Sequence, residues 1–269
     1  MTRLDRELVR RELARSRTHA AALISHGLVS SAGVQLVKAA QQIPDDADLV
    51  VSDDGEPGYA SRAGHKLAGA LAAFPDVSVA GKRCLDAGAS TGGFTDVLLR
   101  NGAREVVAVD VGHGQLVPVL RGDPRVQVHE GLNIRYLDVS AIGGPVALTV
   151  CDLSFISLSL VMGPLSAATE AGGDLLLMVK PQFEVGRERL SRTGVVGSEQ
   201  ERRRAVTQVA RAAAAAALKL SGLAVSPLPG QDGNVEYFLW CVRTLSPSAP
   251  KIEEQEAGVQ KLVSALWPS

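Results

Sequence analysis

The sequence predicts an α/β protein in which a small α+β module precedes a doubly wound, mostly parallel sheet. Two patterns support this fold class. From Cys84 onward, short apolar runs typical of strands buried on both faces alternate with segments of helical length. Before Ser61, two short helical patterns and three short strand patterns lead to a turn-rich segment. With 269 residues, 46% of them hydrophobic, the chain is long enough to bury the cores of a full domain and a small module.

The N-terminal module should begin with two short helices. Apolar residues at helical spacing extend from Leu4 to Ala14, and Ser16 can cap a second helix that ends at Gly27. Apolar residues around turns predict short strands at 28–29, 34–37 and 49–51. The turn-rich segment 53–58 interrupts both periodicities. We therefore assign residues 1–56 to the module, 57–60 to a linker and 61–269 to the second domain.

Charge is unevenly distributed, although the formal net charge is only −1. Through Lys38 the chain has seven Lys or Arg and three Asp or Glu, whereas residues 39–57 hold six acidic residues and no basic one. Arginines four positions apart share a helix face, so the two helices should present a guanidinium cluster suited to nucleic-acid phosphates. The alternative is a charged helix face that contacts only water. The residues predicted to bind nucleic acid are Arg6, Arg10, Arg11, Arg15, Arg17 and, in the second domain, Arg62.

The second domain should open with a helix from Ser61 whose apolar face includes Leu67. Buried parallel strands are expected at 84–86, 106–110, 126–128, 146–152 and 175–180. The alanine-rich segment 198–220 predicts a long helix. Val225 and the segment 235–242 should complete the sheet as a hairpin, whose second strand would run antiparallel to the parallel strands.

The loop after the first of these strands reads DAGASTGGF, from Asp86 to Phe94. Its glycines leave the backbone free to turn sharply and approach a ligand, and the free amides of the following helix suit an anionic group. Asp110 ends the next strand, where a carboxylate can accept hydrogen bonds from two ribose hydroxyls. A nicotinamide dinucleotide fold normally shows GxGxxG, so the Gly-x-x-x-Gly-Gly spacing favours a nucleoside ligand without a pyrophosphate. A glycine turn needed only for packing is the remaining alternative.

Three charged residues lie at predicted strand ends. Asp152 and Lys180 each end an apolar strand, and Glu236 would begin the antiparallel strand at the same edge of the sheet. The three charges would then converge beside the ligand crevice. Within GNVEYFLW, alternation puts Glu236, Phe238 and Trp240 on one face, so that a carboxylate begins an otherwise apolar row. Solvated strand ends and an edge-strand charge facing water are the alternatives.

Several classes of site and protein fit the sequence poorly. Cys84, Cys151 and Cys241 lie singly in strand patterns, and the five histidines are scattered, which argues against a disulfide framework and a metal site. No apolar run approaches the roughly 18 residues that span a bilayer, and the charged N-terminus is unlike a signal peptide. We therefore expect a cytoplasmic, monomeric protein without membrane-lytic activity.

Several blocks of the chain together resemble the TlyA-type ribosomal RNA 2′-O-methyltransferases, some of which carry the name haemolysin. The segment RLDRELVRRELARSRTHAAALISHGLV is similar to an S4 RNA-binding domain. Blocks similar to an FtsJ-like domain, with its class I methyltransferase (Rossmann-like) sheet, follow in order as SRAGHKL, LDAGASTGGFTDVLL, DLSFISL, VKPQFEVG and PLPGxxGNVEYFLW. The resemblance covers nearly the whole chain. It implies methylation of a cytidine ribose 2′-hydroxyl in 16S or 23S ribosomal RNA, with S-adenosylmethionine as cofactor.

The resemblance also implies roles for particular residues. A Lys-Asp-Lys-Glu tetrad in the wider FtsJ-like group matches Lys66, Asp152, Lys180 and Glu236. In this tetrad, Lys180 would act as a base or orient the hydroxyl. From the residues alone, Lys66 would be interpreted as part of a solvated helix face. The residues implied in S-adenosylmethionine binding are Asp86, Gly88, Ala89, Ser90, Thr91, Gly92, Gly93, Phe94, Asp110, Val111, Asn133 and Asp152.

The chain departs from the family pattern in three places. The linker contains Pro57-Gly58-Tyr59-Ala60 where the family commonly has an aromatic residue and an arginine, RAGHK replaces RGAHK, and no proline follows Lys38. The linker change leaves any tuning of cofactor affinity in doubt, but none of the departures touches the tetrad. A nonenzymatic RNA-binding or ribosome-assembly factor on the same fold is the main alternative function.

Overall fold

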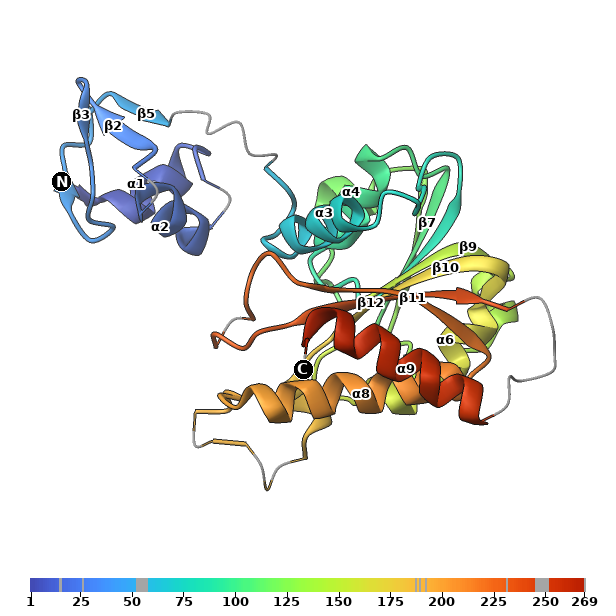
Figure 1. The fold of residues 1–269 in the computed structure, drawn as a ribbon. Coiled ribbons are helices and arrows are strands. Elements are labelled where there is room, and N and C mark those ends of the chain that lie inside the picture. The colour runs from blue at the N-terminus through green and yellow to red at the C-terminus, as the bar shows by residue number, and fades with distance from the viewer. Residues whose placement is uncertain are drawn as a thin grey trace. The chain divides into compact units, whose positions relative to one another are not determined.

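The computed structural model separates the chain into two compact units, Met1–Gly58 and Tyr59–Ser269 (Figure 1). The structure describes residues 1–14, 16–25, 27–51, 58–186, 188, 190–191, 193–230, 232–244 and 252–268, and for Ala22 it describes the backbone alone. Most of the turn-rich segment expected between the domains lies outside these ranges. Tyr59, which the sequence assigns to the linker, is 7% exposed and packs in the core of the second unit.

The first unit packs two short helices and two small sheets around one core. Helix α1 (Leu4–Arg10) is shorter than predicted, because Glu12 adopts a left-handed conformation (φ 60°) and the amides of Leu13 and Ala14 both donate to the carbonyl of Leu8. Helix α2 (Arg17–Ser25) follows, and Ser16 accepts a hydrogen bond from the amide of His19 as expected of a cap. The strands are β2 (Val29–Ser31), β3 (Val34–Gln35) and β5 (Leu49–Val51) in the order β3-β2-β5, and a second pair, which the sequence did not predict, of β1 (Thr2–Arg3) with β4 (Gln42–Ile43).

Seven strands form one sheet in the described part of the second unit. Their order is β11-β12-β10-β9-β6-β7-β8. Among these strands only β12 runs in the direction opposite to the other six, which confirms the doubly wound, mostly parallel fold class with a C-terminal antiparallel strand. The bounds are β6 (Arg83–Ala87), β7 (Glu105–Asp110), β8 (Val126–Glu130), β9 (Val146–Cys151), β10 (Thr169–Val179), β11 (Leu218–Val225) and β12 (Tyr237–Arg243).

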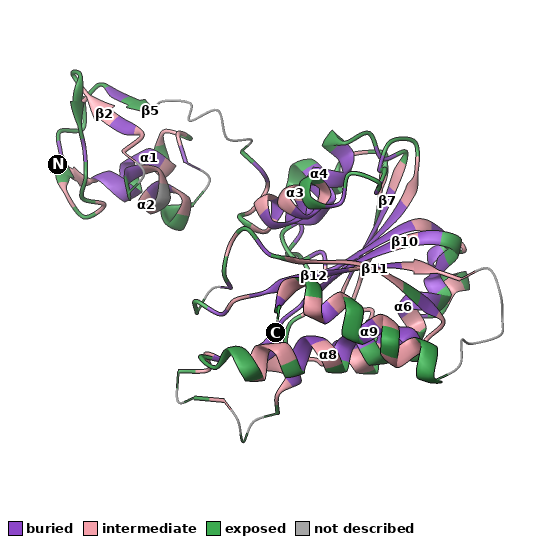
Figure 2. Cartoon of the chain, in the orientation of Figure 1, coloured by how far each residue is buried: buried purple, intermediate pink, exposed green. Residues whose placement is uncertain are grey.

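Helices cover both faces of this sheet, so alternate strand residues enter two separate cores. Cys84 packs in the core beneath α3 and α4, whereas its neighbour Leu85 packs in the core beneath α6, α8 and α9. Figure 2 shows the central strands buried between these helix layers and exposed residues along α8 and α9. The helices are α3 (Ala63–Ala73), α4 (Gly93–Arg100), α5 (Pro118–Arg121), α6 (Met162–Ala168), α7 (Pro181–Glu184), α8 (Glu199–Ala215) and α9 (Ile252–Leu266), with the 3-10 helices η1 (Ile134–Tyr136), η2 (Val139–Ile142) and η3 (Leu158–Leu160).

The prediction of one helix over 198–220 is wrong at its C-terminal end. Helix α8 stops at Ala215, because Ala217 adopts a left-handed conformation (φ 58°) that a helix cannot continue. Leu218 then begins β11 and pairs with Arg243 of β12. Alanine propensity therefore determined where the helix forms, but pairing with β12 determined where it ends.

Within the described residues, no helix is both long enough and apolar enough to span a membrane.

Candidate active site

The register of three neighbouring strands brings the predicted strand-end charges to one edge of the sheet. Val179, the last residue of β10, pairs with Tyr237, the first residue of β12. Lys180 and Glu236 therefore lie next to each other at the ends of adjacent antiparallel strands. Asp152 follows β9, which runs parallel to β10 on its other side.

Two ion pairs connect the four residues of the predicted tetrad. Lys66 Nζ lies 2.5 Å from Glu236 Oε2, and Lys180 Nζ lies 2.7 Å from Asp152 Oδ1. Lys66, Lys180 and Glu236 are each no more than 9% exposed. A charge with so little access to water needs an opposite charge beside it, and each lysine has one. The arrangement fixes two ammonium groups at the carboxyl edge of the sheet.

The glycine-rich loop between β6 and α4 lies against the segment that carries Asp152. Gly88 has a φ of 90°, and a Cβ atom at this position would lie 2.6 Å from the carbonyl oxygen of Asp152. Gly92 has a φ of 97°, and a Cβ atom there would overlap Leu116 and Leu120. The backbone of this loop therefore has a shape that residues with side chains could not adopt, and it lies beside one member of the tetrad.

Asp86 is fully buried at the end of β6 and has an oxygen atom available for a ligand. Thr95 donates a hydrogen bond of 2.7 Å to Asp86 Oδ2, while Oδ1 has no hydrogen-bond partner among the residues that the structure describes. Burial raises the pKa of Asp86 to about 7, and the negative charge of Asp152 adds to this effect. A cationic ligand group beside Oδ1 would offset the burial of this carboxylate.

Asp110 anchors the neighbouring loops at the end of β7. Its two carboxylate oxygens accept hydrogen bonds from the amides of Ser90, at 2.9 Å, and Gly112, at 2.7 Å. Ser90 and Asp110 also line a small cavity at the carboxyl ends of β7 and β8, together with Ala89, Ala108, Gly112, Gln115, Leu116, Val128, His129 and Glu130. This cavity adjoins the glycine-rich loop, to which Ala89 and Ser90 belong.

Two other residues implied in cofactor binding do not line that cavity. Val111 is 62% exposed directly after Asp110. Asn133 accepts a hydrogen bond of 2.9 Å from the amide of Arg135 and so caps η1. The structure therefore gives Asn133 a local role in the loop after β8.

The segment after Asp152 contains two residues that the sequence analysis did not single out. Ser154 accepts a hydrogen bond of 3.0 Å from Lys180 Nζ. Phe155 is 91% exposed and has a φ of 64°, a conformation that is strained for an aromatic residue. Its ring lies 5.3 Å from that of Phe183, and Lys180 Nζ lies 6.0 Å from the Phe183 ring. The motif DLSFISL was the only feature of the sequence that marked this segment. It does not predict a left-handed backbone at Phe155, because no residue pattern indicates that conformation.

Glu184 connects the segments that follow the two strand ends. Its carboxylate accepts hydrogen bonds from the hydroxyl of Ser157, at 2.6 Å, and the amide of Leu158, at 2.8 Å. Burial raises the pKa of Glu184 above its usual value. Because Glu184 lies one helical turn after Lys180, this contact holds η3 and α7 together beside the Lys180–Asp152 pair.

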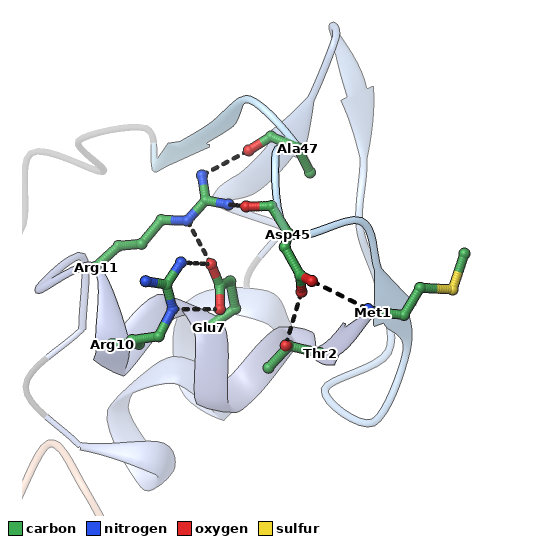
Figure 3. A network of polar contacts seen from close by, with 7 residues as sticks. All are labelled: Met1, Thr2, Glu7, Arg10, Arg11, Asp45 and Ala47. Carbon is green, nitrogen blue, oxygen red and sulfur yellow. Dashed lines mark hydrogen bonds and ion pairs between the residues drawn. The ribbon is translucent and has the colours of Figure 1, made fainter.

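Several of the predicted nucleic-acid-binding arginines pair with acidic residues of the first unit. Arg10 and Arg11 both contact the buried carboxylate of Glu7, whose pKa they lower to about 2, and Arg11 also donates to the carbonyls of Ala47 and Asp45 (Figure 3). This intramolecular network includes Asp45, whose side chain accepts hydrogen bonds from the N-terminal ammonium group and Thr2. Arg11 is therefore a structural residue of this unit.

The other predicted arginines differ in how far they are free to bind a ligand. Arg17 donates to Asp5 Oδ2 at 2.8 Å but keeps 55% of its side chain exposed, and Arg6 is exposed. Arg15 lies outside the described residues. Arg62, at the start of α3, donates a hydrogen bond of 2.7 Å to the carbonyl of Pro229. Nearby carboxylates and carbonyls, which the sequence pattern cannot reveal, already bind several of these guanidinium groups. Fewer of them are therefore free to contact a nucleic acid than the sequence predicts.

Comparison with known proteins gives consistent matches over both units. The profile of the FtsJ-like methyltransferase family matches residues 59–243. The 16S/23S rRNA (cytidine-2′-O)-methyltransferase TlyA of Mycobacterium tuberculosis is 51% identical over 97% of this chain and 97% of its own length. Hemolysin A of Brachyspira hyodysenteriae is 35% identical over 88% of this chain and 98% of its own. Among solved structures, a hemolysin-named protein from Streptococcus thermophilus superposes with a TM-score of 0.74 at 35% identity, covering 98% of this chain and 94% of the other.

Proposed function

Because the chain belongs to the FtsJ-like methyltransferase family, we propose that it transfers a methyl group from S-adenosylmethionine to the 2′-hydroxyl of a cytidine in ribosomal RNA, in the cytoplasm. The mycobacterial relative carries the name of this activity on 16S and 23S rRNA. One structural observation supports the proposal above others. Two buried lysine–carboxylate pairs converge beside a glycine-rich loop at the carboxyl edge of the sheet.

The residues around the glycine-rich loop fit S-adenosylmethionine. Oδ1 of Asp86, which has no hydrogen-bond partner among the described residues, is suited to the ammonium group of a methionine moiety, because it lies buried beside the loop. The glycine-rich loop lies close to the tetrad, because Gly88 packs against the backbone carbonyl of Asp152. Asp110, at the end of β7, would accept hydrogen bonds from ribose hydroxyls. When bound, the cofactor supplies a methyl group already activated on a sulfonium.

The tetrad would then align and deprotonate the acceptor. A ribose hydroxyl is a poor nucleophile until its proton is removed, so a group within hydrogen-bond distance must orient the oxygen and receive the proton. Asp152 and Ser154 fix Lys180 Nζ from two directions, which suits it to hold the hydroxyl in line. To accept that proton, Lys180 would first have to release one of its own ammonium protons to solvent. The Lys66–Glu236 pair would form the opposite wall, and correct alignment alone can lower such a barrier by several kcal/mol.

Phe155 and Phe183 are suited to hold the base of the acceptor nucleotide. The exposed ring of Phe155 lies against that of Phe183, which is itself next to Lys180, and provides a surface on which any base can stack. A nucleotide within a structured RNA must leave its helical stack before its ribose can enter a protein site. The strained backbone of Phe155, which keeps the ring exposed, supports this role.

The first unit would bind RNA as an S4-like domain and hold it near the second unit. Arg6 and the exposed part of Arg17 are available for phosphates, and contacts of this type fix the register without reading bases. Such binding should weaken steeply as the salt concentration rises.

A methylation assay with mapping of the modified nucleotide tests the proposal. The protein is incubated with labelled S-adenosylmethionine and with ribosomal subunits, or naked rRNA, that lack 2′-O-methyl groups. Label at a cytidine 2′-oxygen, absent when Lys180 is replaced by methionine, supports the proposal. Cofactor binding without transfer to any ribosomal RNA would favour the nonenzymatic assembly factor and overturn it. Comparing subunits with naked RNA identifies which of them is the substrate.

A further inference from the structure

One face of α3 contacts the loop that leads into Glu236. Arg62, Lys66 and Gly69 are spaced at i, i+4 and i+7, so they lie on the same side of the helix. Arg62 Nη2 donates to the carbonyl of Pro229 at 2.7 Å, and Lys66 pairs with Glu236. A Cβ atom at Gly69 would lie 2.5 Å from Pro227 Cγ, so this residue allows close packing of the loop against α3.

The described residues of this loop, 226–230 and 232–236, fold closely around the Glu236 side chain. The amide of Ser226 donates to the carbonyl of Glu236 at 2.9 Å, and the amide of Gly230 donates to the carbonyl of Asn234 at 2.8 Å. A Cβ atom at Gly230 would lie 2.6 Å from Glu236 Oε1. The position of the Glu236 carboxylate therefore depends on the position of the loop backbone.

Asn234 holds the other end of the loop. Its side-chain oxygen accepts a hydrogen bond of 2.9 Å from the amide of Val196, and its side-chain nitrogen donates one of 3.1 Å to the carbonyl of Gly194. Asn234 is 2% exposed. With this end fixed to a neighbouring segment, the contact between Arg62 and Pro229 determines how the tip of the loop approaches α3.

We infer that Arg62, although exposed, acts as a positioning residue for the Lys66–Glu236 pair through its hydrogen bond to the Pro229 carbonyl. Arg62 lies one helical turn before Lys66, and Pro229 lies in the loop that leads into Glu236. The Arg62–Pro229 hydrogen bond therefore links α3 to this loop a second time, beside the link made by the Lys66–Glu236 ion pair. Without it, the loop can move away from α3 and separate a buried ammonium group from its carboxylate. This inference rests on the proposed function, in which that pair forms part of the reaction site.

The kinetic test replaces Arg62 with alanine and with lysine in the full chain. We expect Arg62→Ala to lower kcat about 3- to 10-fold, the effect of one exposed hydrogen bond, with the KM for RNA changed less than about twofold. Arg62→Lys should recover part of kcat, because an ammonium group can also donate to the Pro229 carbonyl. Arg104→Ala is the matched control, since Arg104 is exposed just before β7, at the opposite edge of the sheet. A raised KM for RNA with an unchanged kcat would overturn the inference.

A second measurement needs no substrate. Hydrogen exchange of the free protein should become faster at the amides of Ser226 and Gly230 in Arg62→Ala, while the strand amides of β12 and the melting temperature stay as in Arg104→Ala. Unchanged exchange in the loop would contradict the inference even if activity falls. If the wild-type protein methylates no RNA, the proposed function fails, but the exchange experiment still tests the contact between α3 and the loop.

A variant on the loop side covers the case in which Arg62→Ala does not fold. Gly230→Ala leaves Arg62 intact but adds a methyl group against the Glu236 carboxylate. It should reproduce the loss of kcat with an unchanged KM for RNA. Combined with Arg62→Lys, its effect should be less than additive, because both changes act on the same pair. Full additivity would mean that the two residues act separately and would count against the inference.

Discussion

Lys180 Nζ lies 2.7 Å from Asp152 Oδ1, although the two residues follow different strands. Because β9 and β10 are neighbouring parallel strands, their carboxyl ends meet at one edge of the sheet. In addition to this ion pair, Ser154 accepts a hydrogen bond from the same ammonium group. The position of Lys180 is thus set by two strand ends and the turn that follows one of them, which is the rigidity that an aligned proton acceptor requires.

Replacing Lys180 with methionine should reduce methyl transfer by at least about 100-fold, the lower range for a proton-transfer group. Methionine retains the apolar stem of the side chain, so the fold should be preserved. Cofactor affinity should change less than about threefold, because Asp86 and the glycine-rich loop would supply that affinity. Single-turnover transfer and calorimetric titration with S-adenosylmethionine measure the two effects separately. Equal losses in both would indicate a structural role for Lys180.

Ser154→Ala provides a milder change at the same ammonium group. It removes one hydrogen bond to Lys180 but leaves Asp152 in place. We expect turnover to fall about 3- to 10-fold, in line with the net effect of one hydrogen bond. A loss as large as that of Lys180→Met would mean that Ser154 itself contacts the acceptor.

The convergence of three of these charges could be predicted from the sequence, because it follows from topology. Apolar runs of strand length identified the parallel sheet, and parallel strands end at a common edge, so Asp152 and Lys180 were expected together. Alternation within the last strand put Glu236 on the face of Phe238, and the structure has Phe238 in the core beneath α3. Both predictions came from local sequence patterns, the apolar runs and the alternation, each of which is compatible with a single arrangement of strands.

Lys66 and Phe155 could not be predicted in this way. Lys66 looks like a surface residue along its own helix, and its burial depends on the β11–β12 loop that packs against α3 from a distant part of the chain. The left-handed conformation of Phe155 likewise depends on its surroundings, because phenylalanine does not favour it. The family resemblance identified Lys66 as a site residue, whereas nothing in the sequence pattern identified Phe155.

The raised pKa of Asp86 should make stability fall as pH increases. The unfolded carboxyl loses its proton near its usual pKa of 3.8, whereas the folded one keeps it until about pH 7. The folded state therefore binds more protons between these values, so the free energy of unfolding should decrease by at least about 1 kcal/mol from about pH 5 to about pH 8. Asp86→Asn should flatten this part of the profile. Denaturant unfolding at several pH values measures it, and parallel profiles for the two proteins would refute the prediction.

Phe155→Ala should weaken use of the RNA substrate without affecting the cofactor. If a base stacks on this ring, its loss should lower kcat/KM for RNA about 5- to 160-fold, the equivalent of about 1–3 kcal/mol. Phe155→Tyr keeps the aromatic surface and should retain most of the activity. The left-handed backbone strains alanine and tyrosine as it strains phenylalanine, and only Phe155→Gly relieves it, so this variant separates loss of the ring from relief of strain. Full activity in Phe155→Ala would exclude a stacking role.

Arg6 and Arg11 should respond differently to the same substitution, although the sequence predicts one role for both. Arg6 is exposed, so Arg6→Ala should weaken RNA binding and flatten its dependence on salt, with an unchanged melting temperature. Arg11 holds the buried Glu7 carboxylate and two carbonyls of the segment around Asp45, so Arg11→Ala should lower the melting temperature of the first unit by several degrees. Thermal unfolding and RNA binding at several salt concentrations distinguish the two effects. If Arg11→Ala weakened RNA binding with full retention of stability, the network around Glu7 would be dispensable for the fold and Arg11 would belong with the phosphate contacts.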